Sequence, residues 1–319
     1  MGALSLSPEV PPALAALVER LRRGESAALA RCLSLVEQGG GVADTICRLV
    51  HAATGRAVVV GFSGPPGAGK STLIDAYLAH VRAGGRSVAV AAVDPSSPIS
   101  GGSVLGDRVR MHRHTEDAGV FIRSISSRGH LGGLSENIHR VVDLMDASGR
   151  DVVIIETVGA GQSEVELIEV ADVCVIVNAP NLGDDVQAIK AGILEIADVL
   201  VVNKADLPLA SRTVEQLRAM LTLRAEHRDV PVLETVATSG AGVEALAAAI
   251  EARANSSAAQ KRANRLRRIR RLIAQSAGRQ IRDRILSLDS PQSDALLLAT
   301  LEGHCGIAEA VESVLRLLD

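Results

Sequence analysis

The sequence predicts an α/β fold with a mostly parallel central sheet flanked by helices. Short, almost uninterrupted apolar runs recur along the middle of the chain, as in AVVVGFSG and DVVIIETVG. Stretches with helical spacing of apolar residues separate these runs, as in STLIDAYLAHVRAGG. Strands that are buried on both faces and alternate with helices are typical of a parallel sheet. Each run also ends in polar or glycine-rich residues, and such sheets bind ligands at the carboxyl ends of their strands.

The composition is that of a globular protein and narrows the classes of function. The 319 residues are 47% hydrophobic and 1% aromatic, and the formal net charge is −3. A slightly acidic chain with so few aromatic residues does not favour a nucleic-acid binder. No apolar run reaches the ~18 residues that a membrane helix needs, and the beginning of the chain lacks the pattern of a secretory signal. The scattered cysteines predict buried, reduced thiols in a cytoplasmic protein.

The elements are expected in the following order. Residues 1–56 form an N-terminal helical segment, because LAALVERL and ESAALARCLSLVEQ carry apolar residues at three- and four-residue spacing. Residues 57–253 form the sheet domain. Its strands are expected in the segments AVVVGFSG, SVAVAAVD, DVVIIETVG, VCVIVNAP, VLVVNKAD and PVLETVAT. The segments STLIDAYLAHVRAGG and LSENIHRVVDLMDASG are two of the intervening helices.

Residues 254–319 are expected to form a C-terminal helical extension. Its basic run KRANRLRRIRR is compatible with RNA or membrane binding, but a solvated helical face fits an acidic chain better. The expected buried stripe of this helix consists of Leu266, Ile269, Leu272 and Ile273. A second apolar helical pattern follows in ALLLATLEGHCGIAEAVESVLRLL. Two such helices are too few to bury their apolar faces alone, which predicts a homodimer formed through this extension.

A phosphate-binding loop is predicted directly after the first apolar run. GPPGAGKS matches the pattern G-x-x-x-x-G-K-[ST] and stands between a strand and a helix, as that chemistry requires. The glycines let the backbone curl so that its N–H groups face the phosphates, and the helix adds its positive end. Lys70 is expected to reach the β- and γ-phosphates, Ser71 to place its hydroxyl on Mg²⁺, and Thr72 to lie near the α-phosphate. The predicted nucleotide-binding residues of this P-loop are Gly64, Pro65, Pro66, Gly67, Ala68, Gly69, Lys70, Ser71 and Thr72.

The motif NKAD selects guanine as the base. The carboxylate of Asp206 can accept hydrogen bonds from the N1–H and the exocyclic amine of guanine, an arrangement that adenine does not offer. The stem of Lys204 can lie along the base, and Asn203 can tie neighbouring loops together. The loop TSGAG follows the next predicted strand, and its residues Thr238, Ser239 and Gly240 are expected to offer backbone N–H groups to guanine O6. GTP is therefore the predicted nucleotide.

Acidic residues at two other strand ends predict a metal site. Asp94 ends the run SVAVAAVD, and Glu156 ends the run DVVIIE. In a parallel sheet both would stand beside the phosphate loop, and nucleotide-bound Mg²⁺ is usually held by one or two carboxylates. Asp107 lies in the loop GGSVLGDRVRM, which could reach over the γ-phosphate. If the nucleotide is hydrolysed, either Asp94 or Asp107 could orient the water that attacks the γ-phosphate. The sequence does not choose between them.

Several long motifs resemble one family. The phosphate loop, DPSSP, GGSVLGDRVRM, ETVGAGQSE, GDDVQAIKAG and NKAD occur in the order found in the MeaB/ArgK-type GTPases associated with methylmalonyl-CoA mutase. The resemblance covers almost the whole chain. It implies a G-protein chaperone that gates the delivery of adenosylcobalamin to a cobalamin-dependent acyl-CoA mutase and helps to expel damaged cofactor. It also implies GTP, GDP and Mg²⁺ as ligands, no tightly bound cobalamin on this chain, and a homodimer.

The resemblance also assigns roles that the residues alone do not. It implies that Asp94, Asp107 and Glu156 are the metal-binding and catalytic carboxylates, beside Lys70. It places Arg110 in a first switch and Gly159 and Gln162 in a second switch near the γ-phosphate. A third switch, which responds to the mutase, would contain Asp184, Gln187 and Lys190. Partner binding could order this switch and bring Lys190 or Gln187 into the catalytic site.

Alternative functions share parts of this pattern. A small-molecule kinase, such as an arginine-transport kinase, would need an acceptor pocket, and the sequence shows no added substrate domain. A GTPase for nickel insertion would usually carry clustered metal ligands, whereas the histidines here do not cluster outside HRH at residues 112–114. A regulator that binds nucleotide without hydrolysing it is a third alternative. The particular mutase, whether for methylmalonyl-, isobutyryl-, ethylmalonyl- or 2-hydroxyisobutyryl-CoA, is not specified by the sequence.

Overall fold

The chain divides into two compact units, residues Met1–Ser256 and Ser257–Asp319. The structure is a computed structural model. It describes residues 10–94, 114, 116–126, 138–157, 167, 170–180, 197–222, 229–255, 266, 269–270, 273–274, 277–278 and 280–318.

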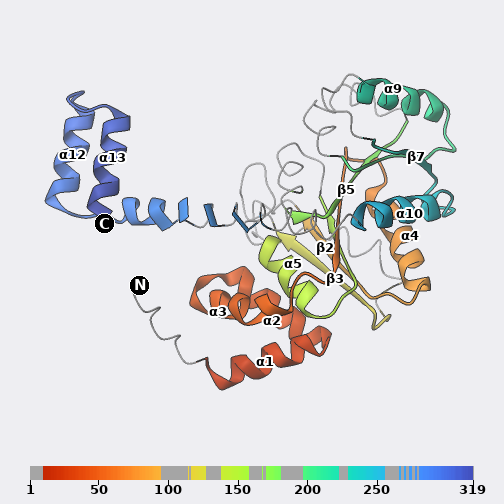
Figure 1. Ribbon diagram of the computed structural model, residues 1–319, viewed down its shortest axis with the longest axis horizontal. Helices are drawn as coiled ribbons and strands as arrows, with labels where there is room; N and C mark the ends of the chain where they lie inside the picture. The colour runs from red at the N-terminus through yellow and green to blue at the C-terminus, as the bar shows by residue number, and fades with distance from the viewer. Residues whose placement is uncertain are drawn as a thin grey trace. The chain divides into compact units, whose positions relative to one another are not determined.

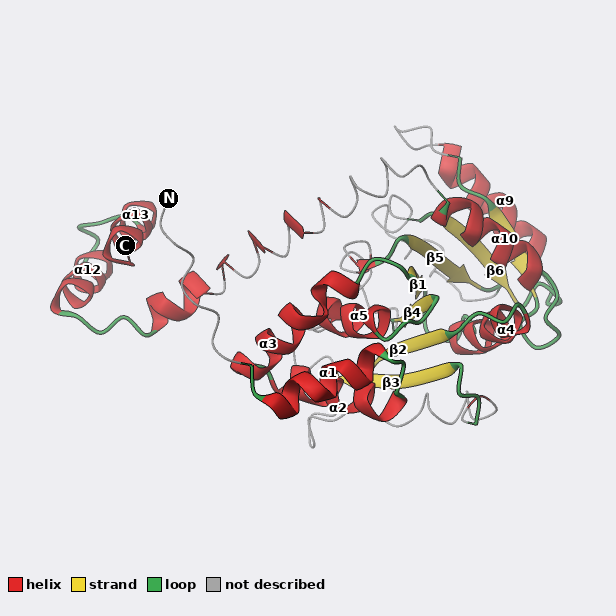
Figure 2. Cartoon of the chain, turned by 60° about the horizontal axis from the view of Figure 1, so that its bottom comes forward, coloured by secondary structure: helices red, strands yellow, loops and turns green. Residues whose placement is uncertain are grey.

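The first unit is built on a parallel sheet (Figures 1 and 2). Within the described residues, seven strands lie in the order β3-β2-β4-β1-β5-β6-β7, and every pairing between them is parallel. The strands are β1 (Val58–Ser63), β2 (Val88–Asp94), β3 (Val120–Ser126), β4 (Val152–Glu156), β5 (Val173–Asn178), β6 (Val199–Asn203) and β7 (Val232–Thr235). The α/β fold class with a parallel sheet is thereby confirmed.

Helices cover both faces of this sheet. They are α1 (Pro12–Arg22), α2 (Ser26–Gln38), α3 (Gly40–Val50), η1 (His51–Ala53), α4 (Lys70–Ala83), α5 (Ile138–Ala147), α9 (Ala210–Thr222) and α10 (Val243–Ala254). Helices α4 and α10 lie beside each other and pack on one face with Val60, Phe62 and Ile154 (Figure 1). On the other face, α1, α2, α3 and α5 cover β2, β4 and the start of β5, and α9 covers β6. Burial on both faces explains why the strands read as continuous apolar runs.

The strand β3 was not among the predicted strands. It forms the edge of the sheet beside β2, and its sequence VFIRSIS is interrupted by Arg123 and Ser124. Arg123 donates to Glu37 Oε2 at 2.7 Å and to Ser34 Oγ at 3.2 Å, both on α2. An edge strand that packs against a polar helix surface lacks the uninterrupted apolar run by which the other strands were predicted.

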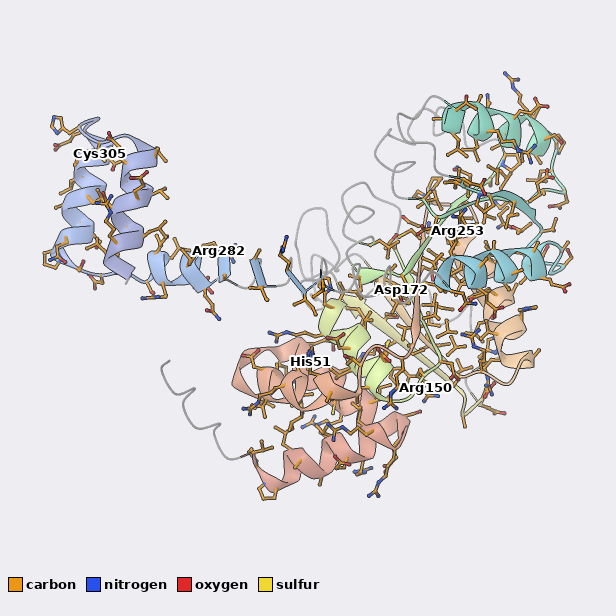
Figure 3. The ribbon with its side chains drawn as sticks, in the orientation of Figure 1. His51, Arg150, Asp172, Arg253, Arg282 and Cys305 are labelled. Atoms are coloured by element: carbon orange, nitrogen blue, oxygen red, sulfur yellow. The ribbon has the colours of Figure 1, made fainter. Side chains whose placement is uncertain are left out.

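Aspartates fix the beginnings of two strands, and of these Asp172 is exposed and Asp198 is buried. Asp172 Oδ2 accepts a hydrogen bond from the N–H of Val59 at 2.9 Å, which joins the start of β5 to β1 (Figure 3). Asp198 Oδ2 accepts one from the N–H of Cys174 at 2.8 Å, which joins the start of β6 to β5. These contacts set the register of the strands whose opposite ends carry the predicted nucleotide site.

The second unit contains the helices α12 (Pro291–Leu301) and α13 (Ile307–Leu318). Ser290 caps α12, because its hydroxyl accepts from the N–H of Ser293 while Ser293 Oγ accepts from the N–H of Ser290, both at 3.1 Å. Large apolar side chains of this unit are exposed, among them Leu297 at 64% and Leu301 at 83%. Among the described residues, no helix is long and apolar enough to span a membrane.

Two expectations about side-chain burial are wrong. Leu266, Ile269 and Ile273 are 57%, 41% and 64% exposed, because no described element of the chain covers the stripe that they form; Leu272 lies outside the described residues. None of the four cysteines forms a disulfide in the structure, and only Cys32 and Cys174 are buried, whereas Cys47 and Cys305 are partly exposed. Burial raises the pKa of the Cys32 thiol to about 11, so it is protonated at neutral pH.

Candidate nucleotide-binding site

The loop between β1 and α4 has a backbone shape that requires glycine. Gly64, Gly67 and Gly69 have φ angles of 141°, 82° and 85°, which side-chain-bearing residues rarely adopt. A Cβ atom at Gly64 would collide with the carbonyl oxygen of Val177, and one at Gly69 would lie 2.5 Å from Asn203 Nδ2. The loop therefore packs directly against the ends of β5 and β6, as only glycine allows.

The carbonyl groups of this loop are held by side chains from β6 and the residue after it. Asn203 Nδ2 donates to Ala68 O at 2.9 Å and to Gly69 O at 3.4 Å, and Lys204 Nζ donates to Gly67 O at 2.8 Å. Because the N–H of a peptide points away from the neighbouring carbonyl, anchoring the carbonyls in this way orients the N–H groups as an anion cradle. Helix α4 begins at Lys70, so its positive end and its unpaired first N–H groups add to the cradle.

Lys70 is the cation of the loop. The residue is 8% exposed, and its Nζ donates to Gly64 O at 2.8 Å and to Pro65 O at 3.1 Å. A buried ammonium that rests on neutral carbonyl groups gains more from a phosphate dianion, which offers charge as well as acceptor oxygens. The lysine is thus placed to exchange these carbonyls for phosphate oxygens.

Two hard oxygen ligands meet on the other side of the loop. Ser71 Oγ donates to Glu156 Oε1 at 2.6 Å, and the two residues are 6% and 5% exposed. Glu156 is the last residue of β4, where it pairs in register with Phe62 of β1. A serine hydroxyl beside a carboxylate at a phosphate cradle suits Mg²⁺, which prefers oxygen ligands and binds through few carboxylates. The described residues therefore fit the metal that the sequence predicts.

The residue after Glu156 was not singled out by sequence reasoning. Thr157 donates from its N–H to Phe62 O at 3.0 Å and from its hydroxyl to Ser63 Oγ at 2.8 Å. With 1% exposure it is as buried as the strand cores. Thr157 fixes the end of β4 against the end of β1, and so fixes the position of Glu156 beside Ser71. Its place directly after a strand-end acid was the only signal in the sequence.

The predicted base-binding loops are joined through Asn203. Its Oδ1 accepts from Thr235 Oγ1 and from the N–H of Ala237, both at 3.1 Å, while its Nδ2 holds the phosphate loop. Lys204 has a φ of 58°, which directs the chain out of β6, and Asp206 follows it as an exposed residue in a turn. One buried amide thereby connects the phosphate loop, β7 and the start of the TSGAG loop.

The TSGAG loop is a tight turn whose N–H groups are partly engaged. The N–H groups of Ser239 and Gly240 both donate to Val236 O, at 3.1 and 3.0 Å. In this arrangement the turn itself uses these two donors, and the predicted contact of the loop with guanine O6 stays a prediction. Of the three predicted residues, Thr238 is the one for which the described contacts include no such bond.

The chain segment before β3 is attached to α4 at two points. His114 Nε2 lies 3.1 Å from Asp75 Oδ1. Arg82 donates from Nε and Nη2 to the two carboxylate oxygens of Asp117, each at 2.8 Å, and this hydrogen bonding holds the pKa of Asp117 below its usual value. The helix that begins in the phosphate loop is thus joined to the segment that follows the first predicted switch.

The remaining predicted residues lie outside the described part of the chain. For Asp94 the structure gives the backbone, at the end of β2, two residues beyond the register partner of Glu156. The others in this group are Asp107, Arg110, Gly159, Gln162, Asp184, Gln187 and Lys190. Their roles stay predictions.

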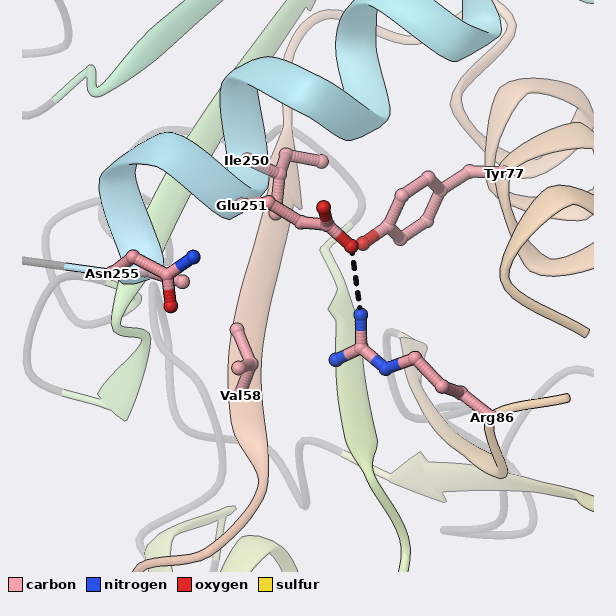
Figure 4. A pocket seen from close by; sticks show the side chains of 7 residues that line it. Val58, Tyr77, Arg86, Ile250, Glu251 and Asn255 are labelled. Atoms are coloured by element: carbon pink, nitrogen blue, oxygen red, sulfur yellow. Dashed lines mark hydrogen bonds and ion pairs between the residues drawn. The ribbon is translucent and has the colours of Figure 1, made fainter. Parts of the chain in front are cut away.

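A cavity of about 290 Å³ lies away from this site, beside the first residue of β1 (Figure 4). Arg86 Nη1 donates to Glu251 Oε1 at 3.0 Å across it. Burial raises the pKa of the Tyr77 phenol to about 12. Arg86 and Glu251 thus pair with each other, whereas Lys70, Asn203 and Lys204 at the phosphate loop donate to backbone carbonyls.

Comparisons with known proteins find matches among GTPases. A sequence profile described as "Methylmalonyl Co-A mutase-associated GTPase MeaB" matches residues 29–290. A Pyrococcus horikoshii protein named as a GTPase is 49% identical over 235 residues, which are 72% of this chain and 74% of that protein. The GTPase ArgK of Escherichia coli is 43% identical over 197 residues, 60% of each chain.

A mammalian relative and a solved structure extend the comparison. The mitochondrial methylmalonic aciduria type A homolog of Mus musculus is 40% identical over 190 residues, 58% of this chain and 46% of that protein. A crystal structure described as a LAO/AO transport system kinase superposes with a TM-score of 0.73 at 25% identity, covering 97% of this chain and 99% of that chain.

Proposed function

The chain belongs to the family of methylmalonyl-CoA mutase-associated GTPases of the MeaB type, and from this premise we propose that it is a G-protein chaperone of an adenosylcobalamin-dependent acyl-CoA mutase. In this proposal GTP binding and hydrolysis gate the loading of intact cofactor into the mutase and assist the release of damaged cofactor. The observation that carries the GTPase half is the linkage of loops: Asn203 and Lys204 of the NKAD motif hold three carbonyls of the phosphate loop.

The proposed chemistry is the in-line attack of water on the γ-phosphate of GTP. The transition state of such a transfer needs neutralisation of charge more than covalent help. Lys70, with its ammonium at the loop carbonyls, would supply positive charge, and the loop N–H groups would bind the phosphate oxygens. Ser71 and Glu156 would hold Mg²⁺, which stabilises charge on the phosphates when bound. Either Asp94 or Asp107 would orient the attacking water, and Gln162 would act near the γ-phosphate.

Slow intrinsic turnover is expected for this arrangement. In the proposal, the water-orienting groups sit on switch segments that must be ordered before hydrolysis. Binding of the mutase would order the third switch, with Asp184, Gln187 and Lys190, and bring Lys190 to the reaction. Lys190→Ala should then keep the basal rate and lose the stimulation. A stimulated rate equal to that of the wild type would contradict this part of the proposal.

The cobalamin-related role depends on a partner that distinguishes nucleotide states. A partner can use the energy of GTP only if it binds the GTP and GDP forms with unequal affinity. The support for a mutase as that partner is the description of the family and the name of the mouse relative, which refers to methylmalonic aciduria. Methylmalonyl-CoA mutase or a close relative, for isobutyryl-, ethylmalonyl- or 2-hydroxyisobutyryl-CoA, is the proposed partner.

A homodimer through the C-terminal unit is part of the proposal. Leu297, Leu298 and Leu301 of α12 are 64%, 56% and 83% exposed, and Ile307 and Val311 of α13 are 73% and 51% exposed. Apolar area of this extent on short helices gains about 25 cal/mol per Å² when it is covered. Leu297→Glu combined with Leu301→Glu should convert a dimer to a monomer in size-exclusion chromatography with light scattering. A wild-type monomer would contradict the proposal.

The central experiment measures nucleotide turnover with and without a partner. Release of inorganic phosphate from GTP is followed for the purified chain alone and with each candidate mutase, in the presence and absence of Mg²⁺. A magnesium-dependent basal rate that rises with one mutase supports the proposal. Transfer of the γ-phosphate to a small molecule instead of water would favour the kinase alternative. The structural relative described as a LAO/AO transport system kinase is named for that kind of activity. Binding without turnover under every condition would favour a regulator that does not hydrolyse GTP.

A further inference from the structure

Asn178, the last residue of β5, carries a buried side-chain amide whose nitrogen has no hydrogen-bond partner among the described residues. The residue is 2% exposed, and within the described part of the chain its Nδ2 has no acceptor. The other residues of the strand, Val173–Val177, are apolar and buried. Leaving a buried amide nitrogen unpaired is energetically unfavourable, and another valine at this position would avoid that cost. A polar side chain retained at such a cost indicates a second state of the protein in which it is paired.

The position of Asn178 connects it to the nucleotide site. Strand β5 lies between β1, which leads into the phosphate loop, and β6, which leads into the NKAD loop. Gly64 passes so close to the carbonyl of Val177 that a side chain there would collide with it. Asn178 also pairs in register with Val202, the residue before Asn203. Asn178 therefore stands at the edge of the sheet where the phosphate loop and the base loop meet.

The same arrangement places Asn178 away from the metal side of the loop. Glu156, the partner of Ser71, ends β4, and β4 lies on the opposite side of β1 from β5. A residue on the β5 side should affect contacts that GDP and GTP share. A residue on the β4 side should affect those that depend on the γ-phosphate.

Nucleotide binding would change the hydrogen bonding of the loop next to Asn178. Lys70 Nζ donates hydrogen bonds to Gly64 O and Pro65 O. The carbonyl groups of the next part of the loop accept instead from Lys204 and Asn203. When the ammonium of Lys70 turns to the phosphates, the first two carbonyls lose their donor. These carbonyls lie at the start of the loop, the part that packs on the end of β5.

We propose that Asn178 is a positioning residue for the guanine nucleotide, whose side-chain amide donates to the backbone of the phosphate loop at Gly64 and Pro65 once Lys70 has turned to the phosphates. The proposal rests on the proposed function in one respect, namely that the chain binds GTP and GDP. It adds a residue that contacts neither the base nor the phosphates and acts through the loop.

The test compares three variants. Asn178→Leu removes the amide at similar volume, Asn178→Ser keeps a smaller donor, and Ile176→Val changes packing on the same strand without touching a polar group. Each is titrated with fluorescent GDP and with a non-hydrolysable GTP analogue, and each is melted with and without nucleotide. For Asn178→Leu we expect both affinities to fall about tenfold and the melting temperature without nucleotide to stay equal or rise. Asn178→Ser should recover part of the loss.

The control variant Ile176→Val should behave differently from Asn178→Leu, and several results would overturn the inference. Ile176→Val should lower the melting temperature equally with and without nucleotide and leave both affinities unchanged. Wild-type affinity for both nucleotides in Asn178→Leu would overturn the inference, as would a loss confined to the GTP analogue. Failure of Asn178→Leu to fold without nucleotide would show a purely structural amide, also against the inference. A wild-type chain that binds neither nucleotide would overturn the proposed function, and this inference with it.

Discussion

The two ends of the parallel strands use polar groups in different ways. At the amino ends, aspartates accept hydrogen bonds from backbone N–H groups: Asp146 Oδ1 from Arg56 and Ala57 at 3.2 and 2.9 Å, and Asp172 and Asp198 from neighbouring strands. At the carboxyl ends, Lys70, Lys204 and Asn203 donate to loop carbonyls, and Ser71 donates to Glu156.

The polar groups at the amino ends stabilise the fold, whereas those at the carboxyl ends can bind a ligand. A carboxylate that is saturated by backbone N–H groups holds the fold, and a ligand has no better partner to offer to those donors. An ammonium or hydroxyl that rests on a neutral carbonyl or beside a carboxylate can exchange its partner for a phosphate or a metal ion at little cost. Burial alone does not distinguish the two classes, since Asp146 and Glu156 are both 5% exposed.

Removal of Lys70, the cation at the carboxyl ends of the strands, should give the largest effect on GTP hydrolysis. It should thereby distinguish the carboxyl ends from the amino ends. Lys70→Ala takes away a charge aimed at the transferred phosphate, so the rate constant of GTP hydrolysis should fall about 10²- to 10³-fold, as for loss of one preorganised donor. The melting temperature without nucleotide should change little. Phosphate release under saturating GTP measures the rate. A variant that keeps half of the wild-type rate would place Lys70 with the structural groups instead.

A variant of Asp206 tests how the loops at the carboxyl ends of the strands recognise the guanine base. Asp206→Asn replaces an acceptor by an amide that cannot accept both guanine hydrogen bonds, so the affinity for GTP should fall about 100-fold. The affinity for xanthosine triphosphate should rise, because xanthine presents a carbonyl to which the new amide can donate. Competitive titrations of the two nucleotides measure the ratio. Unchanged preference for guanine would mean that another residue reads the base.

Asp146 tests the amino ends, where stability should change and binding should not. Its carboxylate accepts from the N–H groups of Gly55, Arg56 and Ala57. Asp146→Ala leaves those donors unpaired, so the free energy of unfolding should fall by roughly 2–4 kcal/mol. Urea unfolding followed by circular dichroism measures it. The folded variant should bind GDP as the wild type does, and weaker binding would break the proposed separation of the two ends.

The smallest expected effect is a dependence of stability on pH at the amino ends. Burial raises the pKa of Asp151, but hydrogen bonds from the Ser87 backbone and hydroxyl lower it more, so it lies below the usual 3.8. Near pH 4 the unfolded chain then binds more protons than the folded one. The stabilisation is therefore present above the unfolded pKa and lost as pH falls through the folded one. Asp151→Asn should flatten the acid side of a plot of melting temperature against pH, and an unchanged slope would contradict this.

Local chemistry made much of the fold and site predictable. Strands that are buried on both faces of the sheet consist of continuous apolar runs. Six strands were therefore predicted, and they correspond to β1, β2, β4, β5, β6 and β7. The phosphate loop was predictable because its glycines, lysine and serine act within eight consecutive residues, Gly64 to Ser71. Strand β3 was not, because an edge strand that packs on α2 through Arg123 lacks that apolar signature.

The sequence by itself determined that a phosphate loop, a guanine motif and strand-end acids stand on a parallel sheet, because each of these is written in a few adjacent residues. Only the tertiary structure decided which polar groups meet. Asn203 holds the carbonyl of Ala68 across 135 positions of the chain, and Ser71 reaches Glu156 across 85. It also left the amide of Asn178 buried without an acceptor in the described residues. Hydrogen bonds reach only about 3 Å, so partners distant in sequence are chosen by how the strands lie side by side, which no local pattern records.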